Sequence, residues 1–395
     1  MPSAQLLRLA RARATLAAAA ILALAGPLVA CDSENVKPPE PAELQKIAAP
    51  AFQPREVWST DTGAGGGSEP RGFRIAQAGD VLYTADYEGQ VSAISARDGK
   101  KLWRQSLKLN IGGGPGIAGG RLALGTLDGE VVALDRASGK AAWRAAVAGE
   151  VLSPPAGTDE VLVAQSLSGR IYGFGANSGQ RLWSFDRNVP TLTLRGNSGP
   201  VITEGRVLAG LDSGKLIAAD IQSGQVLWET AVSLPAGRTE LERLVDIDTE
   251  PALTADTAYV ASYGANLGAV ELASGDLRWR QPIASSAGLA TDGERVYVCD
   301  IDGRVLALDA GSGATLWKQE GLMHRAPSRP ALHAGYVAVG DLDGYVHWLS
   351  PRDGKIVARL RPVGAAIITP PLVVGNRLFV LDADGQLSAL EVGGK

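Results

Sequence analysis

The chain has 395 residues, of which 45% are hydrophobic, 20% are charged and 49 are glycine. This composition allows a large buried core and excludes a disordered or collagen-like chain. The formal net charge of -4 argues against a surface that follows nucleic-acid phosphates.

The N-terminal thirty residues have the layout of a secretory signal. Arginines between residues 8 and 13 precede the apolar run "ATLAAAAILALAGPLVA", which is typical of a signal peptide, a transmembrane helix being the alternative. "LVAC", residues 28–31, resembles the lipobox of bacterial lipoproteins, in which the cysteine becomes the lipidated first residue. We therefore expect a signal peptide over residues 1–30 and a stable lipid anchor of several acyl chains on Cys31.

Residues 31–54 are rich in proline and charge and have no apolar periodicity. This composition predicts a linker between the lipid and the folded body. The other cysteine, Cys299, has no partner once Cys31 is acylated. We expect a buried thiol there and no disulfide framework.

A unit of about forty residues recurs along the rest of the chain, as in "YEGQVSAISARDGKKLW" and "LDGEVVALDRASGKAAW". Alternating apolar residues between glycine turns at this period indicate four short strands per unit, which is a propeller blade. The eighth unit ends before its outer strand, and "REVWST", residues 55–60, supplies the missing piece. The sequence therefore predicts an all-β, eight-bladed β-propeller of four-stranded blades over residues 55–395. An N-terminal strand closes its last blade, so no sheet edge stays open.

A tryptophan stands at one position of the repeat in seven blades, and packing between blades explains it. These residues are Trp58, Trp103, Trp143, Trp183, Trp228, Trp279 and Trp317. The seventh unit has Ala358 instead, and Trp348 lies outside the register.

Two neighbouring connections between blades are longer than the others. We call residues 186–200 the first long connection and residues 230–251 the second. Both run from an outer strand to the next inner strand, so they are expected side by side on one rim. Stability does not require them, and long ordered loops on a rigid scaffold are commonly functional.

The two long connections have the composition of a protein interface, with apolar residues beside charged ones. The first offers Leu192, Leu194 and Arg195. The second offers acidic residues around three apolar ones: Glu240, Glu242, Asp246, Asp248 and Glu250, with Leu241, Leu244 and Val245. The alternative is that these loops cap the blade ends with a local Arg-to-Asp bridge.

No cofactor or metal site is predicted. Asp246 and Asp248 alternate as in a calcium loop, but the glycine and the distal glutamate of an EF-hand are missing. The glycine-rich segments 63–72 and 111–116 open no helix, and the three histidines stand on different elements.

The unit "ALDRASGKAAW" is similar to the tryptophan-docking repeat of the pyrroloquinoline-quinone propeller proteins, over nearly all of residues 56–395. The lipobox, the closed eight-bladed repeat, "LTLRGNSGP" (192–200) and "GRTELERLVDIDTEP" (237–251) together resemble the BamB family. These are lipoprotein subunits of the outer-membrane β-barrel assembly machine.

The resemblance implies a scaffold without catalytic activity that helps outer-membrane proteins fold and insert. It also implies that a periplasmic POTRA domain of BamA is contacted by a set of five residues: Leu192, Leu194, Arg195, Asp246 and Asp248. Direct contact with unfolded outer-membrane proteins is left open.

The implied location is the periplasmic face of the outer membrane. Asp32 departs from this pattern, because in enteric bacteria an aspartate after the lipidated cysteine tends to retain a lipoprotein at the inner membrane; sorting rules differ between bacterial groups. Two other functions stay open. A quinone-dependent dehydrogenase would resemble the fold, but such enzymes typically hold the cofactor against a disulfide of adjacent cysteines, which this sequence lacks. The other is a periplasmic propeller that binds peptides or sugars.

Overall fold

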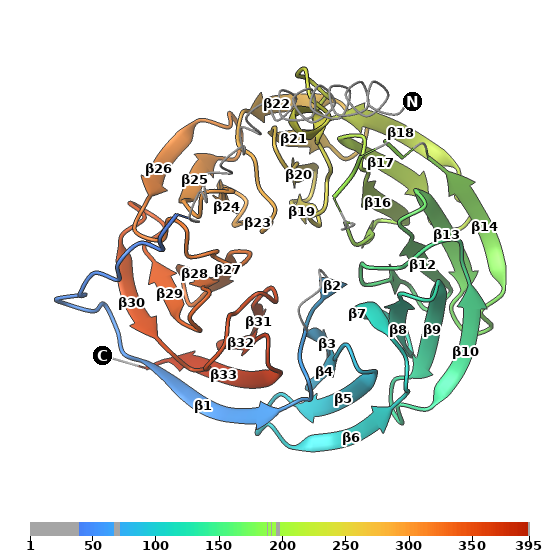
Figure 1. The fold of residues 1–395 in the computed structure, drawn as a ribbon, viewed down its shortest axis with the longest axis horizontal. Coiled ribbons are helices and arrows are strands. Elements are labelled where there is room, and N and C mark those ends of the chain that lie inside the picture. The colour runs from blue at the N-terminus through green and yellow to red at the C-terminus, as the bar shows by residue number, and fades with distance from the viewer. Residues whose placement is uncertain (1–38, 67–71, 188, 191, 195–197, 394–395) are drawn as a thin grey trace, which may run out of the picture. The chain divides into compact units, whose positions relative to one another are not determined.

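The computed structural model describes residues 39–66, 72–187, 189–190, 192–194 and 198–393. A compact unit begins at Pro41. Its strands form eight sheets that follow one another around a ring (Figure 1). The only helical element among the described residues is one 3-10 turn, η1 (Leu241–Arg243). The predicted all-β propeller with eight blades is therefore confirmed.

Each of the first four blades is an antiparallel sheet whose strands follow chain order from the axis outward. Blade 1 holds β3 (Ala76–Ala78), β4 (Val81–Ala85), β5 (Gln90–Ser95) and β6 (Lys101–Ser106). Blade 2 holds β7 (Ile111–Ala118), β8 (Arg121–Thr126), β9 (Glu130–Asp135) and β10 (Ala141–Ala146), with β2 (Gly72–Phe73) added parallel to β7. Blade 3 holds β11 (Ala156–Gly157), β12 (Val161–Gln165), β13 (Arg170–Gly175) and β14 (Arg181–Asp186). Blade 4 holds β15 (Val201–Thr203), β16 (Arg206–Gly210), β17 (Lys215–Asp220) and β18 (Val226–Ala231).

The remaining blades repeat this order, except that the last one takes its outer strand from the N-terminal side. Blade 5 holds β19 (Ala252–Leu253), β20 (Thr257–Ala261), β21 (Leu267–Glu271) and β22 (Leu277–Gln281). Blade 6 holds β23 (Leu289–Thr291), β24 (Arg295–Cys299), β25 (Val305–Asp309) and β26 (Thr315–Gln319). Blade 7 holds β27 (Ala331–His333), β28 (Tyr336–Gly340), β29 (Val346–Leu349) and β30 (Ile356–Leu360). Blade 8 holds β31 (Leu372–Val374), β32 (Arg377–Leu381), β33 (Gln386–Val392) and β1 (Pro54–Asp61).

The N-terminal strand closes the ring as predicted. β1 pairs antiparallel with β33, and the pairing includes Trp58 opposite Ala389. Because β1, the first strand among the described residues, completes the last blade, the edge of β33 is covered and cannot pair with another chain.

The tryptophans hold neighbouring blades together. The indole nitrogen of Trp103 in blade 1 donates a hydrogen bond to the carbonyl oxygen of Arg136 in blade 2 over 3.2 Å. Its ring packs on Gly139, whose φ of 71° suits glycine and where a Cβ atom would lie 2.7 Å from the ring. The same donation into the next blade recurs at Trp58, Trp143, Trp183, Trp228, Trp279 and Trp317. Packing between blades, as predicted, is confirmed.

In blade 7 the tryptophan has changed strands. Trp348 on β29 lies directly opposite Ala358 on β30, whereas Trp103 of blade 1 lies on the outer strand opposite Ala93. Both blades thus pair a tryptophan with an alanine, but in blade 7 the tryptophan lies on the third strand and the alanine on the outer strand. Trp348, which the sequence places outside the register, is fully buried and belongs to the core.

Residues before β1 also contact the propeller. Phe52 is buried beside Trp348, with ring centroids 5.9 Å apart, and beside Tyr336 at 4.8 Å. The amide of Ala51 donates to the carbonyl oxygen of Val357 in β30 over 3.0 Å. This part of the predicted linker therefore packs on blade 7.

Cys299 lies at the end of β24 and is fully buried, which confirms the expected free thiol. Its Sγ donates to the carbonyl oxygen of Ser328 over 3.3 Å. Cys31 and Asp32 lie outside the described residues. Within the described part of the chain, no helix has the length and apolar character needed to cross a membrane.

Candidate functional site

The two long connections lie side by side, as the repeat count predicts. The backbone amide of Leu194 in the first long connection donates a hydrogen bond to Oδ2 of Asp246 in the second. Ser198 Oγ of the first donates to the carbonyl oxygen of Thr249 in the second over 3.0 Å. These contacts make one continuous surface from loops that leave different blades.

The predicted site residues differ in exposure. Leu192 is 44% exposed, and Leu194 is partly buried. Asp246 is only 1% exposed and Asp248 is partly buried. Arg195 lies outside the described residues. Leu192 is thus open to a partner, whereas the carboxylate of Asp246 is engaged inside the chain.

The apolar part of the second long connection differs from the expectation. Leu244 and Val245 are buried within the chain, so they cannot form the expected apolar centre of an interface. Leu241 and Leu234 are exposed instead, by 70% and 61% of their surface. The large apolar side chains that the described part of the two long connections exposes most are therefore Leu192, Leu234 and Leu241. The buried pair was missed because one sequence cannot tell which apolar residues of an irregular loop turn inward.

The tip of the second long connection is a hydrogen-bonded turn that carries Leu241. Its hydrogen bonds are local: Glu242 accepts from the backbone amides of Arg238 over 2.7 Å and Thr239 over 3.1 Å. Thr239 Oγ1 in turn accepts from the amide of Glu242 over 3.2 Å. This reciprocal arrangement is that of a capping box, which fixes the start of a helical turn. These bonds define the backbone of the turn on which Leu241 is exposed.

Three carboxylates meet below this surface. Asp212, in the turn between β16 and β17, joins Asp246 and Asp248, and one oxygen of each residue lies within 4.8 Å of the others. Burial and the nearby charge of Asp246 raise the pKa of Asp212 to about 7. Burial, together with the charges of Asp246 and Asp212, raises the pKa of Asp248 to about 8. Burial also raises the pKa of Asp246.

Asp212 was not identified from the sequence, although the repeat contains a signal for it. It stands two residues before the turn glycine Gly214. The equivalent residues of the other blades are apolar or aromatic: Tyr87, Leu127, Leu167, Tyr263, Ile301, Leu342 and Ala383. A carboxylate at this one position is a break in the repeat, and it faces the acidic segment of the second long connection.

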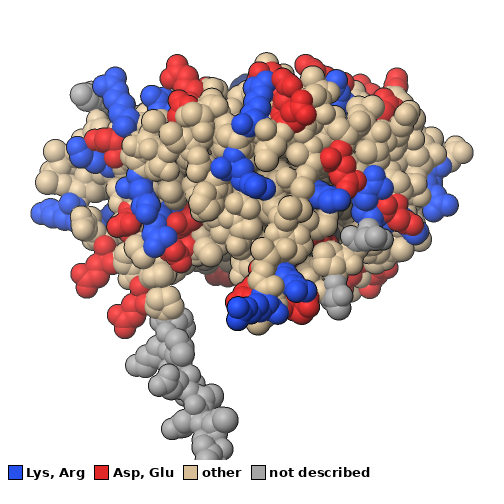
Figure 2. All heavy atoms as spheres, turned by 90° about the horizontal axis from the view of Figure 1, so that it is seen from above, with Lys and Arg blue, Asp and Glu red and all other residues tan. Residues whose placement is uncertain are grey.

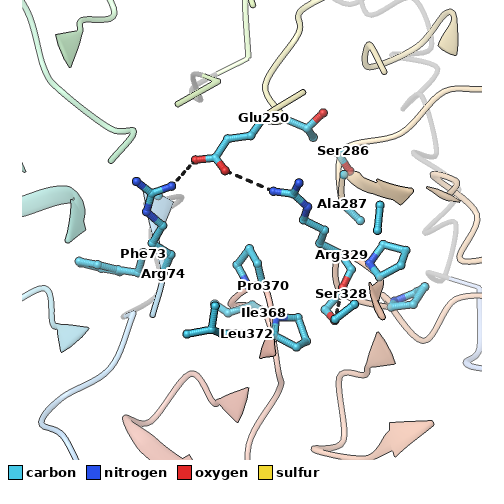
Figure 3. A pocket seen from close by; sticks show the side chains of 18 of the residues that line it. Phe73, Arg74, Glu250, Ser286, Ala287, Ser328, Arg329, Ile368, Pro370 and Leu372 are labelled. Atoms are coloured by element: carbon cyan, nitrogen blue, oxygen red, sulfur yellow. Dashed lines mark hydrogen bonds and ion pairs between the residues drawn. The ribbon is translucent and has the colours of Figure 1, made fainter. Parts of the chain in front are cut away.

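Glu250, at the end of the second long connection, turns to the axis of the ring. It pairs with Arg74 over 2.6 Å and with Arg329 over 3.2 Å (Figure 3). These side chains line a pocket of about 1040 Å³ to which all eight blades or the segments entering them contribute. Glu250 is thus engaged within the chain and is not part of the exposed acidic set, contrary to the expectation.

Charges of both signs are interspersed over the side of the propeller that Figure 2 shows. This face has no field of a single sign. The observation agrees with the composition, which argues against nucleic acid as a partner.

Comparison with known proteins gives one consistent result. A family described as outer membrane protein assembly factor BamB matches residues 49–108, 87–319 and 302–394. The curated protein of that name from Pseudomonas aeruginosa is 48% identical and covers 95% of this chain and 98% of its own length. The one from Escherichia coli is 36% identical over 86% of this chain and 89% of its own length.

Solved structures agree in fold. The crystal structure of BamB from Moraxella catarrhalis matches with a TM-score of 0.78 and 30% identity, covering 86% of this chain and 99% of that one. A quinohemoprotein alcohol dehydrogenase from Comamonas testosteroni matches with a TM-score of 0.69 but only 13% identity, over 87% of this chain and 77% of its own. That likeness concerns the propeller alone.

The curated relatives are named as assembly factors, which favours the predicted non-catalytic protein over a dehydrogenase. The family match, the two relatives and the eight closed blades agree with the resemblance carried by the two long connections. The chain belongs to the BamB family of outer membrane protein assembly factors.

Proposed function

We propose that this chain is a non-catalytic lipoprotein scaffold of the outer-membrane β-barrel assembly machinery, which binds a periplasmic POTRA domain of BamA through its two long connections. The names of its relatives support a part in outer-membrane protein assembly. The observation that carries the docking proposal is the exposure of Leu192, Leu234 and Leu241 on two connections that contact each other.

These three leucines have the composition of an interface centre. Single exposed leucines are common on protein surfaces, whereas three on two connections that contact each other favour an interaction site. Exposed Glu240 and Arg243 flank Leu241 in the sequence, and interfaces combine apolar residues with charged ones in this way. The hydrogen bond between Leu194 and Asp246 joins the two connections.

The proposal places the protein at the periplasmic face of the outer membrane, anchored by lipid on Cys31 after removal of residues 1–30. Residues 31–40 then form the tether. Replacing Cys31 by alanine should release the protein from the membrane fraction. A Cys31→Ala protein that stays with the outer membrane in the absence of BamA would contradict the lipid anchor.

The docking test measures the affinity of the chain for the periplasmic region of BamA. A double substitution Leu192→Asp and Leu241→Asp should weaken binding at least about tenfold, because hot-spot residues contribute about 2 kcal/mol or more. Arg195→Glu should weaken it as well. Leu102→Asp is the matched control, since Leu102 is 55% exposed on β6, on the opposite side of the ring from the second long connection (Figure 1). Unchanged affinity in the double variant, with the fold intact, would contradict the proposal.

A further inference from the structure

The cluster of Asp212, Asp246 and Asp248 poses a problem of charge. Asp246 is 1% exposed, and Asp212 is also buried. Among the described residues, no lysine or arginine forms an ion pair with any of the three carboxylates. Buried carboxylates must be neutralised, either by a proton or by a bound cation, because the cost of removing their charge from water is otherwise large.

A second observation points to a ligand between these carboxylates. Oδ1 of Asp246 and Oδ1 of Asp248 are both buried and receive no hydrogen bond from a described residue. The other oxygen of Asp246, Oδ2, accepts a hydrogen bond from the amide of Leu194. Oδ1 of Asp246 is therefore the oxygen that is free to bind a ligand shared with the other two carboxylates. Buried carboxylate oxygens without a donor are uncommon in folded proteins.

The geometry suits an oxygen-binding cation. Ca²⁺ lies about 2.3–2.6 Å from its ligands, so two of its ligands are at most about 5 Å apart. One oxygen from each of the three carboxylates falls within 4.8 Å of the others, which is compatible with one shared ion. The three side chains offer only oxygen, the ligand that hard cations prefer.

The backbone holds the cluster in place. The amide of Ile247, between the two acids of the second long connection, donates to the carbonyl oxygen of Leu211 over 3.3 Å. Leu211 directly precedes Asp212. The Asp246–Asp248 segment is therefore fixed against the turn of blade 4 that departs from the repeat.

We propose that Asp212, Asp246 and Asp248 bind one divalent cation of the Ca²⁺ type, which joins the second long connection to blade 4. No metal site was predicted from the sequence, because only Asp246 and Asp248 were compared with the calcium-binding loop of an EF-hand. The third carboxylate comes from a different blade, where no local motif reveals it. The proposed site belongs to the free chain and does not depend on binding to BamA.

The test titrates CaCl₂ into the full chain, purified in detergent and freed of metal with EDTA, at pH 8. Calorimetry should show one bound Ca²⁺ per chain, with a dissociation constant of about 0.1–1 mM, as in other extracellular sites. Ca²⁺ should also raise the melting temperature. Asp212→Asn and Asp248→Asn should each weaken binding at least tenfold. Asp128 is an exposed carboxylate in the turn of blade 2 that corresponds to the Asp212 turn of blade 4, and Asp128→Asn should leave binding unchanged.

Three results would overturn the proposal. The first is the absence of heat and of a thermal shift in the wild-type chain at 10 mM CaCl₂. The second is binding that both cluster variants leave unchanged, which would place the ion elsewhere. The third is binding that appears only in an Arg195→Gln variant, since the arginine and not an ion would then neutralise the carboxylates. Circular dichroism checks that each variant is folded, and asparagine keeps the size of the side chain it replaces.

Discussion

The backbone amide of Leu194 donates a hydrogen bond to Oδ2 of Asp246, and this contact ties the first long connection to the second. Asp246 is buried, so its carboxylate supports the surface and is not itself an exposed charge. Asp246 then contributes to partner binding by holding the first long connection in position. Leu192, two residues away from Leu194, is the group that a partner can reach.

Replacing Asp246 should loosen the first long connection. In Asp246→Leu the amide of Leu194 loses its acceptor, and because Leu194 is only partly buried, the cost should lie near the lower end of the about 1–3 kcal/mol for an unpaired buried donor. Hydrogen exchange of the Leu194 amide should become at least about fivefold faster. Asp246→Asn keeps an acceptor oxygen and should exchange nearly as slowly as the wild-type chain. Equal exchange in all three proteins would show that the hydrogen bond does not hold the connection.

Phe52 should contribute to the stability of the propeller although it precedes the closing strand. It is buried against Trp348 and Tyr336, and removing a buried aromatic side chain typically costs about 3–5 kcal/mol. Urea unfolding should give a loss of that size for Phe52→Ala. Leu102→Ala, at an exposed position, should change stability little.

The same reasoning applies to the start of the chain. A protein that begins at residue 41 should unfold like the full chain, and one that begins at residue 54 should be less stable by about the loss seen in Phe52→Ala. The loss in a Phe52→Ala, Trp348→Ala double variant should be smaller than the sum of the two single losses, because the rings are in contact. Additive losses would mean that the two residues act independently.

Two histidines of blade 7 should make the protein less stable in acid. Burial lowers the pKa of His333 and of His347. Nδ1 of His333 accepts from the indole of Trp348 over 3.1 Å, and Nδ1 of His347 accepts from Nε of Arg359 over 3.0 Å. Both rings are therefore neutral, because a proton on Nδ1 would remove these acceptors.

The sign follows from proton binding. The unfolded chain takes up these protons near a pKa of about 6.5, whereas the folded chain resists them, so the stabilising contribution is complete above that pH and is lost as the pH falls. Nε2 of His347 also lies 2.8 Å from Oδ2 of Asp341, whose charge raises the pKa of His347, and near Arg325, whose charge lowers it. Burial is the larger effect, so the pKa of His347 is lowered overall.

Asp212 and Asp248, whose pKa values are raised to about 7 and about 8, act in the opposite direction, because the folded chain takes up their protons before the unfolded chain does. The histidine contribution is therefore measured as a difference between two chains. From pH 7 to pH 5 the urea midpoint of a His333→Gln variant should change more favourably than that of the wild-type chain, and an identical change would exclude His333 as a source.

Cys299 should be chemically inert in the folded protein. Burial raises the pKa of its thiol, and the thiolate is the reactive form. In a Cys31→Ser chain, in which Cys299 is the only cysteine, a thiol reagent should react slowly under native conditions. It should react at once in denaturant. Rapid native labelling would show that β24 opens to solvent.

The architecture could be predicted because it depends on features that repeat. Seven docking tryptophans, the turn glycines and the period near forty residues specify the blades, and the unmatched strand with Trp58 specifies the closure. Counting the connections also located the two that lie side by side. Each of these features is visible in one sequence because the chain carries eight copies for comparison.

Other features depend on contacts that break the repeat. Trp348 fills the interior of blade 7 because the outer-strand position that holds tryptophan in the other blades is occupied there by the small residue Ala358. This exchange is visible only when the two strands are paired. Asp212 joins the acidic segment from another blade, and the inward turn of Leu244 and Val245 depends on the path of an irregular loop. Local patterns carry little information about such contacts.

The most direct test of the account is a photo-crosslinking measurement in cells that contain the intact assembly machinery. A photoreactive amino acid is placed in turn at Leu192, Leu241 and, as a control, Leu102. We predict crosslinks to a BamA POTRA domain from the first two positions and none from Leu102. Crosslinks from Leu102 alone, or none from Leu192 and Leu241 while the protein still copurifies with BamA, would contradict it.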